Sequence, residues 1–222
     1  MRFKVLLTTL ALASTALVAV QAQDRVGLYL RGTNHQRGGE AIAQETANLY
    51  VYDGAKVKAY DQTKIWAHDT CSVEAYGQAT VEAKAETKIR AFDTTRIIAT
   101  NSANIEANGS SNVVADQHCK IDAHGNVNVN AGDEVVINAD GNCTIFARDK
   151  SKVTANGNCI VMALGNATII ATGNVHIKAY DSARVDAKGD CNVEAWGTAD
   201  ITTDGKVVVE AHDNSVKVNK KG

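Results

Sequence analysis

The chain contains no proline and few aromatic residues, and neither sign of charge dominates. Without proline, every backbone N–H is available to a hydrogen-bonded ladder, as a β-rich fold requires. Aromatic residues make up 5% of the 222 residues although hydrophobic residues make up 45%, so we expect a thin, repetitive core. The 23 basic and 25 acidic side chains argue against a highly charged disordered chain and against nucleic acid as a partner.

The one long hydrophobic run lies at the N-terminus. Arg2 and Lys4 precede an apolar stretch over residues 5–20, and Ala22 completes a small-residue cleavage pattern, which predicts a signal peptide over residues 1–22. A membrane span needs about 20 apolar residues, so we expect no integral membrane span after cleavage, with an uncleaved anchor as the alternative. The protein is therefore expected to be exported to the periplasm, the cell surface or the extracellular space.

Residues 48–215 divide into 21 consecutive octads without insertion or deletion, such as KVKAYDQT at 56–63 and NVEAWGTA at 192–199. Position 2 is always Val, Ile or Leu, position 4 is Ala in 19 octads, and position 6 is Gly, Asp or Asn in 19. Positions 8, 2 and 4 alternate with polar positions 1 and 3, as in a strand with one buried side, and position 6 carries turn residues. Each octad therefore predicts one short strand and one corner.

Alternate octads differ, which indicates how many of them close a coil. Numbered from residue 48, the even octads carry Gly at position 6 in 8 of 10 cases, whereas the odd octads do so in 2 of 11. Asn126, Asn142, Asn158 and Asn174 each follow such a Gly, once in every second octad, and would stack as a ladder. The sequence therefore predicts an all-β, single-domain parallel β-solenoid with two octads per coil and about 10 coils, of undetermined handedness.

The segments on either side of the repeat depart from the octad pattern. Residues 23–47 are expected to form an N-terminal cap with a short helix over residues 40–47, because a repeat stack needs an atypical terminal unit. Residues 216–222 lose the register and form a basic C-terminal tail, whose charges would protect the last strand edge. We therefore expect both ends to be closed, which argues against open-ended polymerisation.

The residues that most often carry chemistry all follow the repeat. The five cysteines occupy the inward position 8 and are interpreted as small buried hydrophobic residues, although Cys143 and Cys159 would lie in adjacent coils, where they could form a disulfide. Corner aspartates are interpreted as solvated turn residues, with a cation site as the alternative. The six histidines show no metal-ligand spacing. The sequence therefore assigns no catalytic residue, cofactor or metal.

The outward positions predict two different faces. Position 3 of the even octads is polar, whereas the odd octads carry apolar residues there, which indicates a contact surface for a protein or a glycan. Its candidate residues are Trp66, Ile98, Val114, Phe146, Ile160, Met162 and Leu164. Cover by the N-terminal segment is the alternative. Aromatic residues two octads apart, such as Tyr60 and Tyr76, are expected to form stacked ladders, with sugar-ring stacking as the alternative.

Two families share features of this repeat. The octads around AYGQAT at 75–80 and AWGTAD at 195–200, with their two-octad superperiod, resemble the octapeptide repeats of bacterial ice nucleation proteins, and the similarity of period covers about three quarters of the chain. The gapless, small-core repeat is also similar to bactofilins. The resemblances imply a bacterial solenoid protein and, for the first family, interaction with ice. That family's Thr-x-Thr rows correspond here to charged or mixed pairs, such as Lys56 with Lys58.

An octad array without insertions leaves no long loop from which to build a concave pocket, so we expect no enzymatic activity. The chain is instead expected to be a secreted, non-catalytic scaffold that is structural or binding, adhesin-like or envelope-associated. Its partner would be a protein surface, a carbohydrate surface or another copy of itself. The alternatives are a structural protein that polymerises end to end and, less favoured, an ice-interacting protein.

Overall fold

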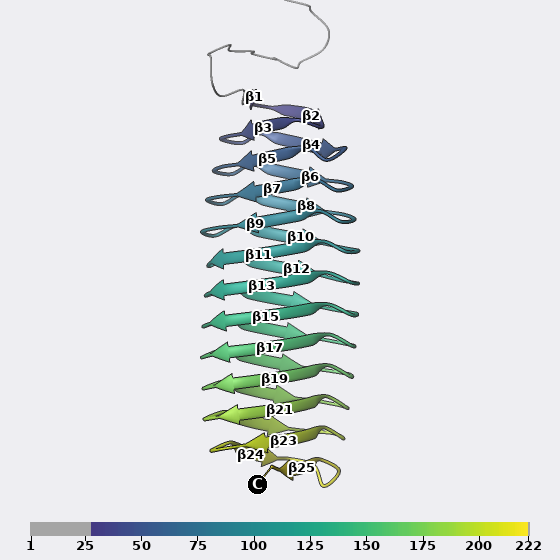
Figure 1. Cartoon of the computed structure of the whole chain (residues 1–222), viewed down its shortest axis with the longest axis vertical. Coiled ribbons are helices and arrows are strands. Elements are labelled where there is room, and N and C mark those ends of the chain that lie inside the picture. Colours follow the sequence, from purple (N-terminus) through teal and green to yellow (C-terminus); the bar gives the residue numbers. More distant parts are fainter. Residues whose placement is uncertain (1–27, 222) are drawn as a thin grey trace, which may run out of the picture.

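The computed structural model describes residues 28–221, which contain strands and no helix. Twenty-five strands form two parallel sheets, one of 13 strands and one of 12. Each strand pairs with the second strand along the chain, so two strands and two corners make one coil. Figure 1 shows these coils stacked along the long axis of a rod. The expected signal peptide lies outside the described residues.

The odd-numbered strands form the first sheet, called sheet A, and the even-numbered strands form the second, called sheet B. Sheet A contains β1 (Leu28–Leu30), β3 (Glu40–Ala43), β5 (Lys56–Ala59), β7 (Ser72–Ala75), β9 (Lys88–Ala91), β11 (Asn104–Gly109), β13 (Lys120–Gly125), β15 (Val136–Gly141), β17 (Lys152–Gly157), β19 (Thr168–Gly173), β21 (Arg184–Gly189), β23 (Asp200–Asp204) and β25 (Lys217–Lys220). Sheet B contains β2 (Thr33–Arg37), β4 (Asn48–Tyr52), β6 (Lys64–Ala67), β8 (Thr80–Ala83), β10 (Arg96–Ala99), β12 (Asn112–Ala115), β14 (Asn128–Ala131), β16 (Thr144–Ala147), β18 (Ile160–Ala163), β20 (His176–Ala179), β22 (Asn192–Ala195) and β24 (Val208–Ala211).

The pairing register equals two octads through most of the rod. Lys120 on β13, for example, lies opposite Asn104 on β11 and Val136 on β15. The predicted asparagine file forms along one edge, where the Nδ2 of Asn142 donates to the Oδ1 of Asn126 at 3.3 Å. The same contact repeats one and two coils further on, at 3.3 and 3.2 Å. The structure thus confirms the parallel β-solenoid with two octads per coil.

The rod is longer than the octads predict, with about 12 coils instead of 10. The expected helix over residues 40–47 is wrong, because β3 occupies Glu40–Ala43 and pairs with β5. In the first two pairings, Leu28 lies opposite Ala41 and Thr33 lies opposite Asn48, so both coils are shorter than two octads. Because these corners differ in length from the later ones, the octad pattern of the sequence does not reveal the first coils. At the other end, Lys217 on β25 lies opposite Asp200 on β23, so one extra corner residue explains the lost register.

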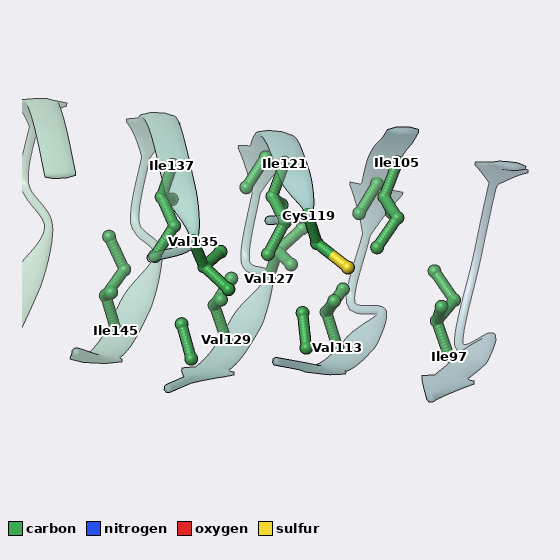
Figure 2. Packing of buried hydrophobic residues seen from close by; sticks show 14 of the residues in the cluster. Ile97, Ile105, Val113, Cys119, Ile121, Val127, Val129, Val135, Ile137 and Ile145 are labelled. Atoms are coloured by element: carbon green, nitrogen blue, oxygen red, sulfur yellow. The ribbon is translucent and has the colours of Figure 1, made fainter. Parts of the chain in front are cut away.

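The core is the narrow space between the two sheets. Inward positions 8, 2 and 4 are buried from coil to coil, with alanine and other small residues on either side of one large aliphatic residue per strand. Figure 2 shows these larger side chains reaching from both sheets toward the middle, among them Ile105, Ile121 and Ile137 from sheet A and Val113, Val129 and Ile145 from sheet B. Few aromatic residues are needed because small side chains hold the two sheets close together.

The corners require a left-handed backbone at position 6. Asp149 has φ of 58° and Gly141 has φ of 104°, a region that glycine enters freely and Asp or Asn enters more readily than most residues. The two exceptions to the Gly/Asp/Asn rule, Ala85 and Gln117, adopt the same conformation with φ of 64° and 66°. The corner geometry is therefore set by the stack, and the residue type only makes it easier to form.

Position 8 is small for packing and also satisfies the corner carbonyl. The Oγ1 of Thr95 donates to the backbone oxygen of Phe92 at 2.7 Å, and the Sγ of Cys159 donates to that of Asn156 at 3.1 Å. Where position 8 is alanine, as at Ala55, its backbone N–H bonds the same carbonyl, that of Tyr52, at 3.2 Å. The backbone N–H of Thr95 also reaches its corner carbonyl, at 3.4 Å, and the buried Oγ1 of Thr63 has no hydrogen-bond partner. Position 8 therefore requires small size first, and a hydroxyl or thiol adds a further bond only at some corners.

Candidate functional site

The predicted contact residues lie on the outer face of sheet B, mostly in one column. Position 3 of successive strands follows the register in the order Trp66, Glu82, Ile98, Val114, Asn130, Phe146, Met162 and Lys178. Ile98 therefore lies beside Val114, and Phe146 beside Met162. Polar residues interrupt the column, with Glu82 before Ile98 and Asn130 before Phe146. The predicted row is three separate segments.

The largest segment is an apolar cluster on β16 and β18, formed by Phe146, Ile160, Met162 and Leu164. Phe146 and Met162 face each other across the pairing of the two strands. Ile160, at position 1 of β18, is 50% exposed, and the other three side chains are half-buried. The guanidinium of Arg148 lies 5.8 Å from the ring centre of Phe146 and covers part of its face. All four members of this cluster were predicted from the sequence.

Trp66 belongs to a different arrangement, an aromatic stack at the N-terminal end of sheet B. Its ring lies 4.7 Å from that of Tyr50, which in turn lies 4.8 Å from that of His35, with interplanar angles of 14° and 12°. Tyr52 and His68 stack beside them at 5.0 Å. Tyr50 and Tyr52 were not predicted as members, although each has a ring-bearing residue two octads later.

The predicted aromatic ladders are confirmed elsewhere on the rod. Tyr60, Tyr76 and Phe92 stack on sheet A at 5.0 and 4.9 Å, and Tyr180, Trp196 and His212 stack on sheet B at 4.6 and 4.4 Å. The ring planes are within 10° of parallel in these stacks. Both faces of the middle ring and one face of each end ring therefore contact another ring. A sugar ring stacks on an open aromatic face. The ladders therefore favour a stabilising role over sugar stacking.

Sheet A presents charges in the place where sheet B presents apolar residues. Along position 3, Glu74 accepts from Lys58 at 3.4 Å and from Arg90 at 3.3 Å, and Arg90 also reaches Glu106 at 3.1 Å. The hydrogen bond and the charge of Glu74 raise the pKa of Lys58. Side chains of opposite charge therefore lie next to each other on neighbouring strands, an arrangement that stabilises a sheet. The charges predicted for sheet A pair with one another from β5 to β11, but exposed large apolar residues lie on both faces, among them Val136 and Ile170 on sheet A and Ile160 and Val208 on sheet B.

The last coil presents a second apolar surface. The inward residues Val207, Val209 and Val216 are only partly buried there, and Val218 on β25 is 41% exposed. β24 and β25 each have one neighbour in their sheets, so each has one strand edge without a partner within residues 28–221. The predicted basic tail thus contains a strand, β25, and its Lys217 and Lys220 place charges on this edge. No described residue packs against the last coil.

The corner aspartates bind backbone groups. The Oδ2 of Asp149 accepts the N–H of Asp133 at 3.3 Å, and the Oδ2 of Asp181 accepts that of Gly165 at 3.1 Å. The hollow beside the first pair is shallow and open, lined by Gln117, His118, Asp133, Glu134, Asp149 and Lys150. Within residues 28–221, no group of three or more His, Cys, Asp or Glu side chains is placed to bind a metal ion. The carboxylates thus have a structural explanation.

All five cysteines are buried free thiols. Cys143 and Cys159 lie in adjacent coils, as predicted, without the disulfide that their spacing allows. The neighbouring Cys159 thiol lowers the pKa of Cys143 to about 7, and the Cys143 thiol together with burial raises the pKa of Cys159. Burial raises the pKa of Cys71 and Cys119. The thiols are inside the rod and are not part of a reactive surface.

The fold and these surfaces define the class of the protein as a parallel β-solenoid with a two-octad coil. No family model, curated protein or solved structure matches the chain. None of the described residues belongs to a helix of the length and hydrophobicity needed to cross a membrane. Statements about function therefore depend on the surfaces of this rod.

Proposed function

We propose that this chain is an exported bacterial protein that serves as a rigid, non-catalytic scaffold and makes lateral protein contacts through the apolar cluster on sheet B. The observation that carries the proposal is the contrast between the two faces. At position 3 of sheet A, Lys58, Glu74, Arg90 and Glu106 pair with one another, whereas sheet B leaves Phe146, Ile160, Met162 and Leu164 partly in water. Apolar residues that remain partly in water on a protein surface can mark a contact site when they form a patch.

The regularity of the rod supports a scaffolding role. The two-octad register continues without interruption from β3 to β24, so the outward residues stand at fixed intervals of about 4.8 Å along the stack. The corners are short and contain no long loop, and catalytic pockets are concave sites with convergent polar groups. The apolar N-terminal run supports export. The gapless, small-core repeat is similar to bactofilins in architecture, which also favours a structural role.

A double variant tests the contact surface, with a second copy of the chain as the partner assayed. Phe146→Ser with Met162→Ser removes the centre of the cluster, and Val136→Ser with Ile170→Ser removes two exposed apolar residues from sheet A as a matched control. Sedimentation velocity over a range of concentrations should show self-association of the wild type and the control and its loss in the cluster variant. Circular dichroism should show that all three fold.

The proposal fails if the cluster variant associates as the wild type does, or if the control loses association to the same degree. A wild-type chain that stays monomeric at every concentration also contradicts lateral contact between copies. Each double variant replaces two outward apolar residues by serine, one pair on each face, so a difference between the two variants is specific to the face that is changed.

End-to-end assembly is a second candidate, favoured by the open last coil. Val218 and its neighbours expose core positions beside two unpaired strand edges, which can add further strands. Negative-stain microscopy should then show fibres that disappear in Val218→Lys, where a charge occupies an inward position. Val208→Lys is the control, because Val208 is 62% exposed but faces outward. Isolated rods of about 60 Å in the wild type would reject this candidate.

A further inference from the structure

Sheet A carries a regular row of basic side chains at position 1 of its strands. Lys88, Lys120, Lys152 and Arg184, called the basic row, lie in one column, separated by Asn104, Val136 and Thr168 on the strands between them. All four basic side chains are exposed. Successive members are two coils apart, about 9.6 Å at 4.8 Å per coil, and the row extends over about 29 Å.

The basic row differs from its neighbours in having no counter-ions. Within residues 28–221, none of its four members forms an ion pair, whereas Lys58 and Arg90 in the adjacent column at position 3 are paired with glutamates. Of the acids beside the row, Asp186 forms an ion pair with Lys221 at 2.9 Å. Asp122 accepts a hydrogen bond from Asn138 at 2.8 Å, and Asp200, opposite Arg184 on β23, accepts one from Asn219 at 3.1 Å. These two acids and Glu86, two residues before Lys88, take part in no ion pair among the described residues.

The width of the row restricts the shape of an anionic partner. Glu106, Asp122 and Asp186 stand in the position 3 column on β11, β13 and β21, which are strands that the row crosses. A broad anionic surface, such as a membrane or a nucleic-acid duplex, would approach these acids as closely as it approaches the lysines, and like charges would repel it. A single extended chain can follow the basic row alone. The partner that fits is therefore narrow and linear.

The spacing of the row restricts the partner further. An extended peptide repeats the same side every two residues, about 6.8 Å, and stacked nucleotides place phosphates about 3.4 Å apart along one strand. The peptide repeat does not match two coils of the solenoid, and the nucleotide repeat would leave two of every three phosphates without a cation of the row. A β-linked polysaccharide in an extended two-fold conformation turns the same side outward every second sugar, a repeat close to that of the row. Asn104 and Thr168 between the cations can bond sugar hydroxyls.

From these observations we infer that the basic row binds a linear acidic polysaccharide, with carboxylates on every second sugar facing Lys88, Lys120, Lys152 and Arg184. The inference concerns the face opposite the apolar cluster and does not depend on lateral protein contacts. Its electrostatic part predicts affinity that falls with salt. Its geometric part predicts that moving a charge within the row weakens the affinity even when the net charge stays constant. A row that only kept the protein soluble would not depend on the positions of its charges.

Fluorescence anisotropy with end-labelled hyaluronan fragments tests both parts, because hyaluronan has one carboxylate on every second sugar. Changing all four row residues to Gln should weaken binding by about tenfold or more, as loss of four cationic contacts implies. The control changes Lys64, Lys84, Arg96 and Lys206 to Gln, which removes the same charge from exposed basic residues outside the row that also have no ion pair in the described chain. This control should bind within about twofold of the wild type.

A register variant tests the spacing without altering charge or composition. Asn104→Lys with Lys120→Asn moves one cation by one coil, and binding should weaken several-fold. Equal affinity of the register variant and the wild type would overturn the geometric argument, as would equal losses in the row and control variants. Binding of oligothymidylate or anionic vesicles more tightly than hyaluronan would assign the row to another class of ligand. No binding of hyaluronan at low salt would reject the inference.

Discussion

The two edges of the rod form the same corner in different ways. Corners that follow sheet B, called the Asp edge, mostly place aspartate at position 6 with φ near 60°. Corners that follow sheet A from β11 onward, called the Gly–Asn edge, place glycine there with φ from 71° to 104°. On the Gly–Asn edge the strands of sheet A from β11 to β21 are six residues long and include the corner glycine, whereas the strands of sheet B beside them have four.

The difference shows that one octad can stabilise its corner by a side chain or by the backbone. On the Asp edge, a carboxylate binds the N–H of the corner one coil earlier, as Asp181 binds Gly165. On the Gly–Asn edge the backbones approach closely, and an added Cβ at Gly141 would lie 2.9 Å from the oxygen of Gly125. The backbone thus leaves little room for a side chain at position 6 in the middle of the Gly–Asn edge, from Gly109 to Gly157, whereas the Asp edge accommodates Gln117.

The largest expected effect is that of a methyl group at Gly141. Gly141→Ala combines a left-handed conformation with contact against the backbone of the adjacent coil, and it should destabilise the rod by about 2 kcal/mol or more. Gly165→Ala on the Asp edge is the control. Its φ is 68° and the nearest backbone atom to the new Cβ lies at 3.3 Å, so about 1 kcal/mol is expected. Urea unfolding followed by circular dichroism measures both, and equal losses would show that the two edges do not differ.

A smaller effect is expected from removing one carboxylate on the Asp edge. Asp181→Ala leaves the N–H of Gly165 without its acceptor at 3.1 Å and should cost about 1 kcal/mol. Asp181→Asn retains an acceptor oxygen and a residue that tolerates the left-handed region, so its stability should be close to that of the wild type. The comparison uses the same urea titration. If alanine is tolerated as well as asparagine, the carboxylate does not stabilise the corner.

Cysteines lie on both edges, so labelling them reports on both edges without a substitution. Cys71 and Cys119 line the Asp edge, and Cys143, Cys159 and Cys191 line the Gly–Asn edge, all of them buried. Burial raises the pKa of Cys71 and Cys119, and buried thiols are slow to react. Iodoacetamide should therefore label none of the five in the folded chain and all five in denaturant. Three labels after denaturation, found by mass spectrometry, would identify a Cys143–Cys159 disulfide instead of two thiols.

The period of the solenoid could be predicted from the sequence because the corner residues differ between the two edges. If every octad had carried aspartate, the positions of Gly125, Gly141 and Gly157 would not have separated coils of two octads from coils of three. The buried positions were predictable for a similar reason, since a strand with one buried side alternates strictly. Both features are periodic, so a single sequence contains many independent copies of the same signal.

The terminal coils could not be predicted, because periodicity is the only signal and their corners differ in length. The pairing of Thr33 with Asn48 is one position short of two octads, and the pairing of Asp200 with Lys217 exceeds two octads by one position. A shift of one residue exchanges the two faces of a strand in the pattern, so β2 and β25 resemble non-repeat segments. The contact row stays a prediction, and Glu82 and Asn130, which occupy position 3 in two of its octads, divide it into separate patches.

The two-octad coil underlies every assignment of a residue to a face or an edge, and engineered disulfides test it most directly. Asn142→Cys with Asn158→Cys places two exposed thiols one coil apart, where the Cα separation of about 4.8 Å lies within the range for a disulfide. Asn142→Cys with Asn166→Cys separates them by three octads and places them on opposite edges. Peptide mapping after mild oxidation should find the bridge in the first variant and none in the second. A bridge in the second variant only would contradict the two-octad coil.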